Sequence, residues 1–272
     1  MSHWVSWRRQ ALVIAASEVR RRLLSRGALA LLVLAGAPVV LCGVRFALVF
    51  TDVGPLENTT EVAYAILYRS VLLRLTVFFG CMIVFTPMIR GDILDRSLHY
   101  WFLAPVRRSV LAAGKFMAGL AVTLAVFGAT TLLTWLLVTA SHGWAELSRK
   151  LASPAGLGEP AAYLAATWLA CLGYGGVFLA VGIVFKQPIV PALGILGWES
   201  LLFLMPAALK KISVVHYVES LLPVAPPEGP LAIIAQPASP WIAVPGVVLV
   251  AAAALLFAAR RLKRTEILYG VE

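Results

Sequence analysis

Charged residues and reactive side chains are scarce in this sequence. Asp, Glu, Lys and Arg make up 13% of its 272 residues, against about 25% in soluble globular domains. The cysteines, Cys42, Cys81 and Cys171, lie singly in apolar runs, with no Cys-x-x-Cys pair and no histidine at zinc spacing. This excludes a disulfide framework, and we interpret the three as small buried hydrophobic residues.

Catalytic motifs are also lacking. Gly114-Lys115 has neither the upstream glycine nor the following Ser or Thr of a phosphate-binding loop, and no His-Glu-x-x-His or Gly-x-Ser-x-Gly is present. The four histidines, His3, His99, His142 and His216, are scattered along the chain, which disfavours a shared metal site. We therefore expect no enzyme activity, metal or other cofactor in this chain.

What the chain has instead is long apolar runs. Hydrophobic residues make up 61% of the sequence, and the mean hydropathy is +0.89. A membrane-spanning helix needs about 20 mostly apolar residues, and six segments qualify: 27–50, 70–89, 116–140, 161–185, 188–207 and 241–259. Only helices or closed barrels can span lipid, and the alternation typical of barrel strands is absent. The sequence predicts an all-α polytopic membrane protein with six transmembrane helices.

The basic residues predict the orientation. In the six-span topology, most of the 23 Lys and Arg residues fall on one side, including Arg20, Arg21, Arg22, Arg107, Arg108, Arg260, Arg261, Lys263 and Arg264. The positive-inside rule places this side, with both termini, in the cytoplasm. We expect a multi-pass protein of the plasma membrane, of the bacterial inner-membrane type. The net charge of +10 is then a topology signal and implies no nucleic-acid partner.

Two segments outside the spans have a distinct character. Residues 2–26 place Leu12, Ala16, Val19 and Leu23 on one helical face beside several arginines, which predicts a helix lying at the membrane surface in contact with lipid phosphates. Residues 208–240 form the largest external segment. Within it, residues 214–222 are apolar enough for a short helix that dips into the outer leaflet, and the prolines that follow prevent a regular helix.

One ionisable residue falls well inside a predicted span. Glu199 is about eight residues from the outer end of the fifth span, roughly 12 Å deep, and such a residue is costly unless it is paired. Arg74, near the outer end of the second span, is the candidate partner. The pair is interpreted as structural, with contact to a transported substrate as the alternative.

The longest polar stretch after the N-terminus is the cytoplasmic loop 91–108. Its candidate functional residues are Asp92, Asp95, Arg96, Leu98, Tyr100, Trp101, Phe102, Pro105 and Arg107. Asp92 and Asp95 could share a helical face as an acid–base pair, but the nearby arginines favour a salt-linked surface. The pattern predicts an amphipathic loop containing a short helix.

This loop resembles that of ABC-2 type permeases, the membrane subunits of one class of ATP-binding cassette exporters. Loops of that family run from acidic residues through a Gly-Thr-Leu-like turn and a Pro-Val-Ser-Arg-like element to Leu-x-x-Gly-Lys. The matching residues here are Asp92, Asp95, Ser97, Leu98, Pro105, Val106, Arg107, Leu111, Gly114 and Lys115. The arrangement of the basic N-terminal helix, six spans and polar segment before the last span is also similar.

The resemblance implies a function as an export permease. Two such subunits, identical or paralogous, would pair in the membrane, and each would sit on a separate cytoplasmic ATPase subunit that binds ATP and Mg²⁺. The 91–108 loop would be the coupling helix, docked in a groove of the ATPase. Its aromatic residues suit this role, because aromatic and Arg side chains dominate binding hot spots.

Two other functions remain as alternatives. The first is an intramembrane enzyme acting on lipids, which would need clustered polar groups in the membrane. The second is a non-transporting membrane anchor or sensor for an ATPase complex, which would share the same features.

Overall fold

The computed structural model describes residues 2–23, 25–49, 60–94, 107–202, 207–224 and 239–264. Regular structure within these ranges is helical throughout, which confirms the all-α prediction. The helices are α1 (Ser2–Leu23), α2 (Arg26–Val49), α3 (Thr60–Leu67), the π-helix η1 (Tyr68–Val77), α4 (Phe78–Phe85), α5 (Pro87–Leu94), α7 (Arg108–Ser141), α8 (Trp144–Ala152), α9 (Pro154–Val184), α10 (Ile189–Ser200), α11 (Ala207–Lys210), α12 (Val214–Glu219) and α13 (Pro240–Arg264).

Five helical stretches in the described part of the chain are long and apolar enough to cross a membrane. They are Gly27–Leu48, Glu61–Leu94, Arg108–Ser141, Gly156–Val184 and Pro240–Leu262. Each overlaps one of the six predicted spans, so five of the six have a matching helix. Several long apolar helices of this kind are typical of a multi-pass membrane protein. Two of the five have 34 residues, about 51 Å at 1.5 Å per residue. They are longer than the roughly 30 Å hydrocarbon core requires, so their ends project beyond it.

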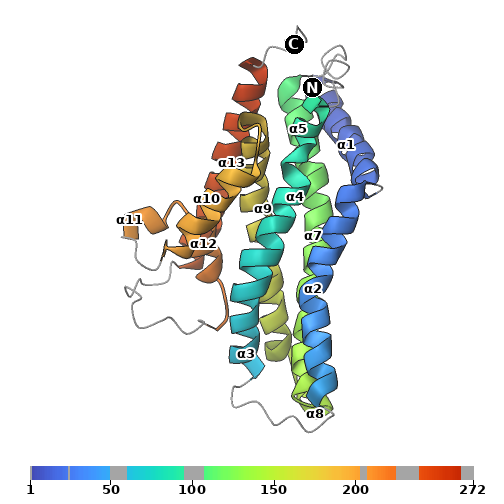
Figure 1. Cartoon of the computed structure of the whole chain (residues 1–272), viewed down its shortest axis with the longest axis vertical. Coiled ribbons are helices and arrows are strands. Elements are labelled where there is room, and N and C mark those ends of the chain that lie inside the picture. Colours follow the sequence, from blue (N-terminus) through green and yellow to red (C-terminus); the bar gives the residue numbers. More distant parts are fainter. Residues whose placement is uncertain are drawn as a thin grey trace.

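The sixth predicted span, 188–207, differs from the prediction. Its helix α10 has 12 residues and covers about 18 Å, too little to cross the hydrocarbon core. Beyond it, α12 packs beside the bundle at mid-length (Figure 1), with Val214 against Gly173 of α9 and Tyr217 against Gly246 of α13. Of the segment 208–240, predicted to be external, residues 225–238 lie outside the described part of the chain.

Close helix contacts form the core. α9 is central, packing along both α7 and α13. A Cβ on Gly176 would lie 3.0 Å from the Ala251 carbonyl oxygen, and one on Gly182 would lie 2.4 Å from that of Thr86. Small residues allow such approach in membrane helices, where packing rather than water exclusion drives association.

Hydroxyl groups add a buried network between η1, α7 and α9. The Tyr68 hydroxyl is 2.9 Å from that of Thr167, which is 3.0 Å from that of Thr131. The Tyr64 hydroxyl donates to the Thr131 carbonyl oxygen at 2.9 Å. The rings of Tyr64 and Tyr68 also pack against Tyr163, with centroids 4.7 and 4.8 Å apart. These contacts fix the relative rotation of the helices.

One end of the bundle gathers α1, α5, the start of α7 and the end of α13 (Figure 1). Arg108 at the start of α7 donates to the Leu262 carbonyl oxygen of α13 at 3.1 Å. This is the end that the charge distribution predicts to be cytoplasmic. α1 is helical, as predicted; it ends at Leu23, and α2 begins at Arg26.

Candidate functional site

A cluster of four charges lies at this end of the bundle. Lys115 of α7 is fully buried, and Glu18 of α1 and Asp92 of α5 are each 1% exposed. The Lys115 Nζ bonds to the Glu18 carboxylate and lies 2.8 Å from Asp92 Oδ2. Arg21 Nη1 donates to Asp92 Oδ1 at 2.9 Å from a half-exposed position. We call these four residues, Glu18, Arg21, Asp92 and Lys115, the charge cluster.

The charge cluster is formally neutral, with two acids and two bases. Buried charges are tolerated only when their partners and hydrogen bonds replace the lost hydration. Here one ammonium group bridges two carboxylates. The half-exposed guanidinium of Arg21 bonds to Asp92 and lies 3.9 Å from Glu18. Three helices that are distant in sequence are joined at this point.

The neighbouring glycine explains how α1 reaches the cluster. A Cβ on Gly114 would lie 2.9 Å from Ile14 Cγ2 and 3.0 Å from the Ala11 carbonyl oxygen. Gly114 therefore leaves space for α1, and Lys115 pairs with it one residue later. In the structure, the Gly114-Lys115 dipeptide of the loop motif forms the contact between α7 and α1.

Arg22 lies next to the charge cluster, at the end of α1. Burial lowers the pKa of its guanidinium, and the nearby Glu18 carboxylate opposes that effect. Arg107, at the N-cap of α7, places its guanidinium carbon 4.1 Å from the centre of the Trp7 ring, a cation–π contact that also joins α7 to α1.

The residues of the candidate coupling loop divide into two groups. Asp92 is in the charge cluster, and Arg107 contacts Trp7. The other predicted loop residues, Asp95, Arg96, Leu98, Tyr100, Trp101, Phe102 and Pro105, lie outside the described residues. The structure thus describes both flanks of the loop and connects them through Lys115.

The intramembrane carboxylate has a different set of partners from the one predicted. Glu199, 4% exposed, accepts from the Tyr174 hydroxyl at 2.6 Å and from the Ser213 hydroxyl at 2.8 Å. The backbone N–H of Val215 approaches it at 3.5 Å. Glu199 thus satisfies donors at the start of α12, where the helical path is broken and the backbone needs partners inside the protein.

Arg74 pairs elsewhere, with Glu219 at the end of α12. Its Nη2 is 3.5 Å from Glu219 Oε1, and Arg69 Nε is 2.8 Å from the same oxygen. No ion pair joins Arg74 to Glu199 among the residues that the structure describes, although the Arg74 charge acts on Glu199 at longer range. The bonds of a π-helix link residues five apart, so η1 directs both arginines to one carboxylate.

Several of these residues were not found from the sequence as partners. The sequence places Glu18 in the predicted surface helix and Lys115 in the motif shared with the permease loop. It predicts no role for Tyr174, Ser213 or Glu219. Their only sequence signal is a polar or charged side chain at the edge of an apolar run. In the described part of the chain, no group of three His, Cys, Asp or Glu residues is arranged to hold a metal ion.

Comparison with known proteins adds no assignment, since neither a family model nor a curated protein sequence matches the chain.

Proposed function

We propose that this chain is the permease subunit of an ABC-2 type exporter. It moves its substrate across the plasma membrane by alternating access, driven by ATP hydrolysis in a separate cytoplasmic subunit that binds ATP and Mg²⁺. A second copy or a paralogous permease completes the membrane assembly. The observation that carries the proposal is the charge cluster, because it joins both flanks of the candidate coupling loop.

The charge cluster can transmit movement of the loop to the helices that flank it. Asp92 lies two residues before the end of α5, and Lys115 lies two turns into α7, so their ion pair closes the base of the loop between them. Lys115 also holds Glu18 of α1. A push on the loop by a partner would therefore move α5, α7 and α1 together, rather than bend the loop alone.

The loop's sequence suits a docking role. Tyr100, Trp101 and Phe102 form an aromatic run flanked by charges, a composition enriched at interface hot spots. The chain carries no phosphate-binding motif of its own, which fits a subunit driven by a partner.

The direct test is whether an ATP-binding cassette ATPase from the source cell co-purifies with the chain. We expect the ATPase to co-purify with the wild-type chain and to be lost with the variant Tyr100→Ala/Trp101→Ala/Phe102→Ala. The matched control is Trp144→Ala/Leu151→Ala/Leu157→Ala, three exposed apolar residues of α8 and α9. This control should retain the ATPase, and both variants should elute as folded protein in size exclusion.

Each result has a distinct meaning. If no ATPase associates with the wild type, the permease assignment fails, and an intramembrane enzyme becomes the better hypothesis. If the ATPase associates but ATP drives no transport in sealed vesicles, the chain is an anchor or sensor of the complex.

A further inference from the structure

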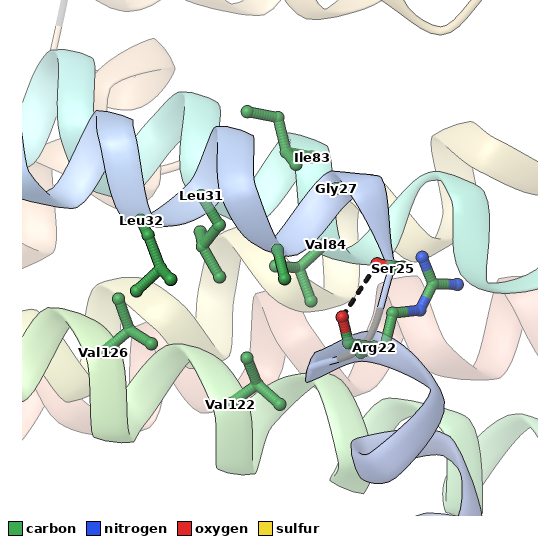
Figure 2. Close-up of a pocket in the computed structure, with 10 residues that line it drawn as sticks. Arg22, Ser25, Gly27, Leu31, Leu32, Ile83, Val84, Val122 and Val126 are labelled. Atoms are coloured by element: carbon green, nitrogen blue, oxygen red, sulfur yellow. Dashed lines mark hydrogen bonds between the residues drawn. The ribbon is translucent and has the colours of Figure 1, made fainter.

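A hollow lies where α1 turns into α2, beside the charge cluster but separate from it. Its volume is about 60 Å³, and it lies between α1, α2, α4 and α7 (Figure 2). Arg22 and Ser25 are at one end. Aliphatic side chains extend away from them, contributed by Leu31, Leu32, Ile83, Val84, Val122 and Val126.

The polar end of the hollow contains the guanidinium of Arg22, which has an unused hydrogen-bond donor. Arg22 Nε is buried and has no hydrogen-bond partner among the described residues. The Ser25 hydroxyl is used locally, donating to the Arg22 carbonyl oxygen at 2.8 Å (Figure 2). A buried donor without a partner is costly, so an acceptor from outside the chain would stabilise this end.

The N-terminus of α2 also lies at the polar end of the hollow, which Ser25, Gly27 and Ala28 help to line. The Ala28 N–H bonds to the Ser25 carbonyl oxygen at 2.9 Å. The N–H groups of Arg26 and Gly27 precede it, at positions that have no acceptor within a helix. The first turn of α2 contains no acidic residue, so its positive helix end is not neutralised locally and favours an anion.

The apolar end reaches into the membrane. Val122 and Val126 lie seven and eleven residues beyond Lys115 on α7, about 11 and 17 Å along a helix. That is close to half of the roughly 30 Å hydrocarbon core. The hollow continues onto a lipid-facing part of α2, where Leu29, Leu32 and Val33 are each at least 60% exposed.

We propose that the hollow between α1, α2, α4 and α7 is a binding site for an anionic phospholipid of the adjacent leaflet. The phosphate accepts from Arg22 and the first N–H groups of α2. One acyl chain enters the hollow with a few methylene groups and continues along α2. This occupant is favoured because the site is charged at the membrane surface and aliphatic at depth, which matches the polarity of a phospholipid. The inference does not depend on the proposed transport function.

Native mass spectrometry of the full chain can test the site. The detergent-purified protein is titrated with phosphatidylglycerol and with phosphatidylcholine of the same acyl chains. We expect the wild type to bind the first phosphatidylglycerol about fivefold more tightly, the factor expected for one arginine at a charged lipid surface. Arg22→Gln should remove most of this preference. Arg20→Gln, an exposed neighbour that does not line the hollow, should retain it.

Two further arms separate the lipid from other occupants. Ala28→Phe fills the hollow and should weaken binding of both lipids, while Ala30→Phe, on an exposed face of α2, should not. Inorganic phosphate at millimolar concentration should not displace the lipid.

Three outcomes would overturn the proposal. Equal losses in Arg20→Gln and Arg22→Gln would indicate general surface charge. Displacement by phosphate would indicate a simple anion site. Equal binding by the two alanine variants would show that the hollow holds no chain. If Arg22→Gln does not fold, the alanine pair and the phosphate competition still decide.

Discussion

At the residue scale, buried charges distinguish this chain from a plain bundle of apolar helices. Lys115 has no exposed surface and contacts two carboxylates from two other helices. In a low-dielectric interior, replacing a complete ion group can be neutral, but removing one member leaves an uncompensated charge. The cost of a substitution here therefore depends on which charges remain.

Replacing only the central lysine should be severe. Lys115→Met leaves Glu18 and Asp92 buried without their shared cation, and we expect it to lower the free energy of unfolding by about 3–5 kcal/mol. The triple variant Glu18→Gln/Asp92→Asn/Lys115→Met should regain much of that loss. Thermal unfolding in detergent, followed by tryptophan fluorescence, measures both effects. Lys186→Met, at an exposed position, is the control. A triple variant no more stable than Lys115→Met would contradict the ion-pair account.

Glu199 should stabilise the fold through the hydrogen bonds that its oxygens accept, rather than through an ion pair with Arg74. Glu199→Gln keeps an acceptor for Ser213 and Val215, so we expect a small loss of stability. Glu199→Ala leaves the buried hydroxyls of Tyr174 and Ser213 without an acceptor, at about 1–3 kcal/mol for each donor. The midpoint of thermal unfolding distinguishes them, with the exposed Ser200→Ala as control. Equal midpoints for the Gln and Ala variants would show that these hydrogen bonds do not hold α12.

At the element scale, α9 is the helix on which the others are positioned. Its contacts with Thr86, between α4 and α5, and with α13 depend on close backbone approach at glycine, and α12 packs against it at Gly173. Because a membrane interior provides no hydrophobic drive between helices, the closeness of these contacts carries much of the association.

A matched pair of glycines in α9 tests this. A methyl group at Gly182 would lie 2.4 Å from the Thr86 carbonyl oxygen and 2.9 Å from its Cα, atoms of a packed backbone that cannot turn aside. We expect Gly182→Ala to lower stability by about 1–3 kcal/mol through overpacking. Gly158→Ala has open space and should be neutral or raise stability by up to about 1 kcal/mol, because alanine favours helix. A chemical-denaturation series measures both; similar values would mean that α9 and its neighbours separate easily.

The sequence predicted the long helices because their apolar runs have the length that lipid demands. It missed the end of α10, since residues 201–205 remain apolar after the helix ends at Ser200, and hydropathy averages over that break. It also missed the shared partner of Arg69 and Arg74, because an ordinary helical period puts residues five apart on different faces. Lys115 and Glu18 are 97 residues apart, and charge alone cannot predict such a pairing.

At the scale of the whole molecule, the direction of two helices determines the path of the chain. Gly173 and Gly176 of α9 approach Val247 and Ala251 of α13 in the same order, so the two helices run parallel. The chain must therefore return to the far side of the bundle between Val184 and Pro240. α10 is about 18 Å long, shorter than the roughly 30 Å hydrocarbon core, so it makes only part of this return.

Cysteine labelling can follow this return. In a background with Cys42, Cys81 and Cys171, all buried, replaced by alanine, single cysteines replace three exposed residues, Trp144, Lys186 and Trp241. A membrane-impermeant maleimide applied to right-side-out vesicles should label Trp144→Cys and Trp241→Cys. Lys186→Cys should react only after permeabilisation, because it follows α9 at the end where the basic residues gather. Labelling of Trp241→Cys together with Lys186→Cys, and not with Trp144→Cys, would mean that the chain does not recross between α9 and α13. The parallel packing of these two helices would then be wrong.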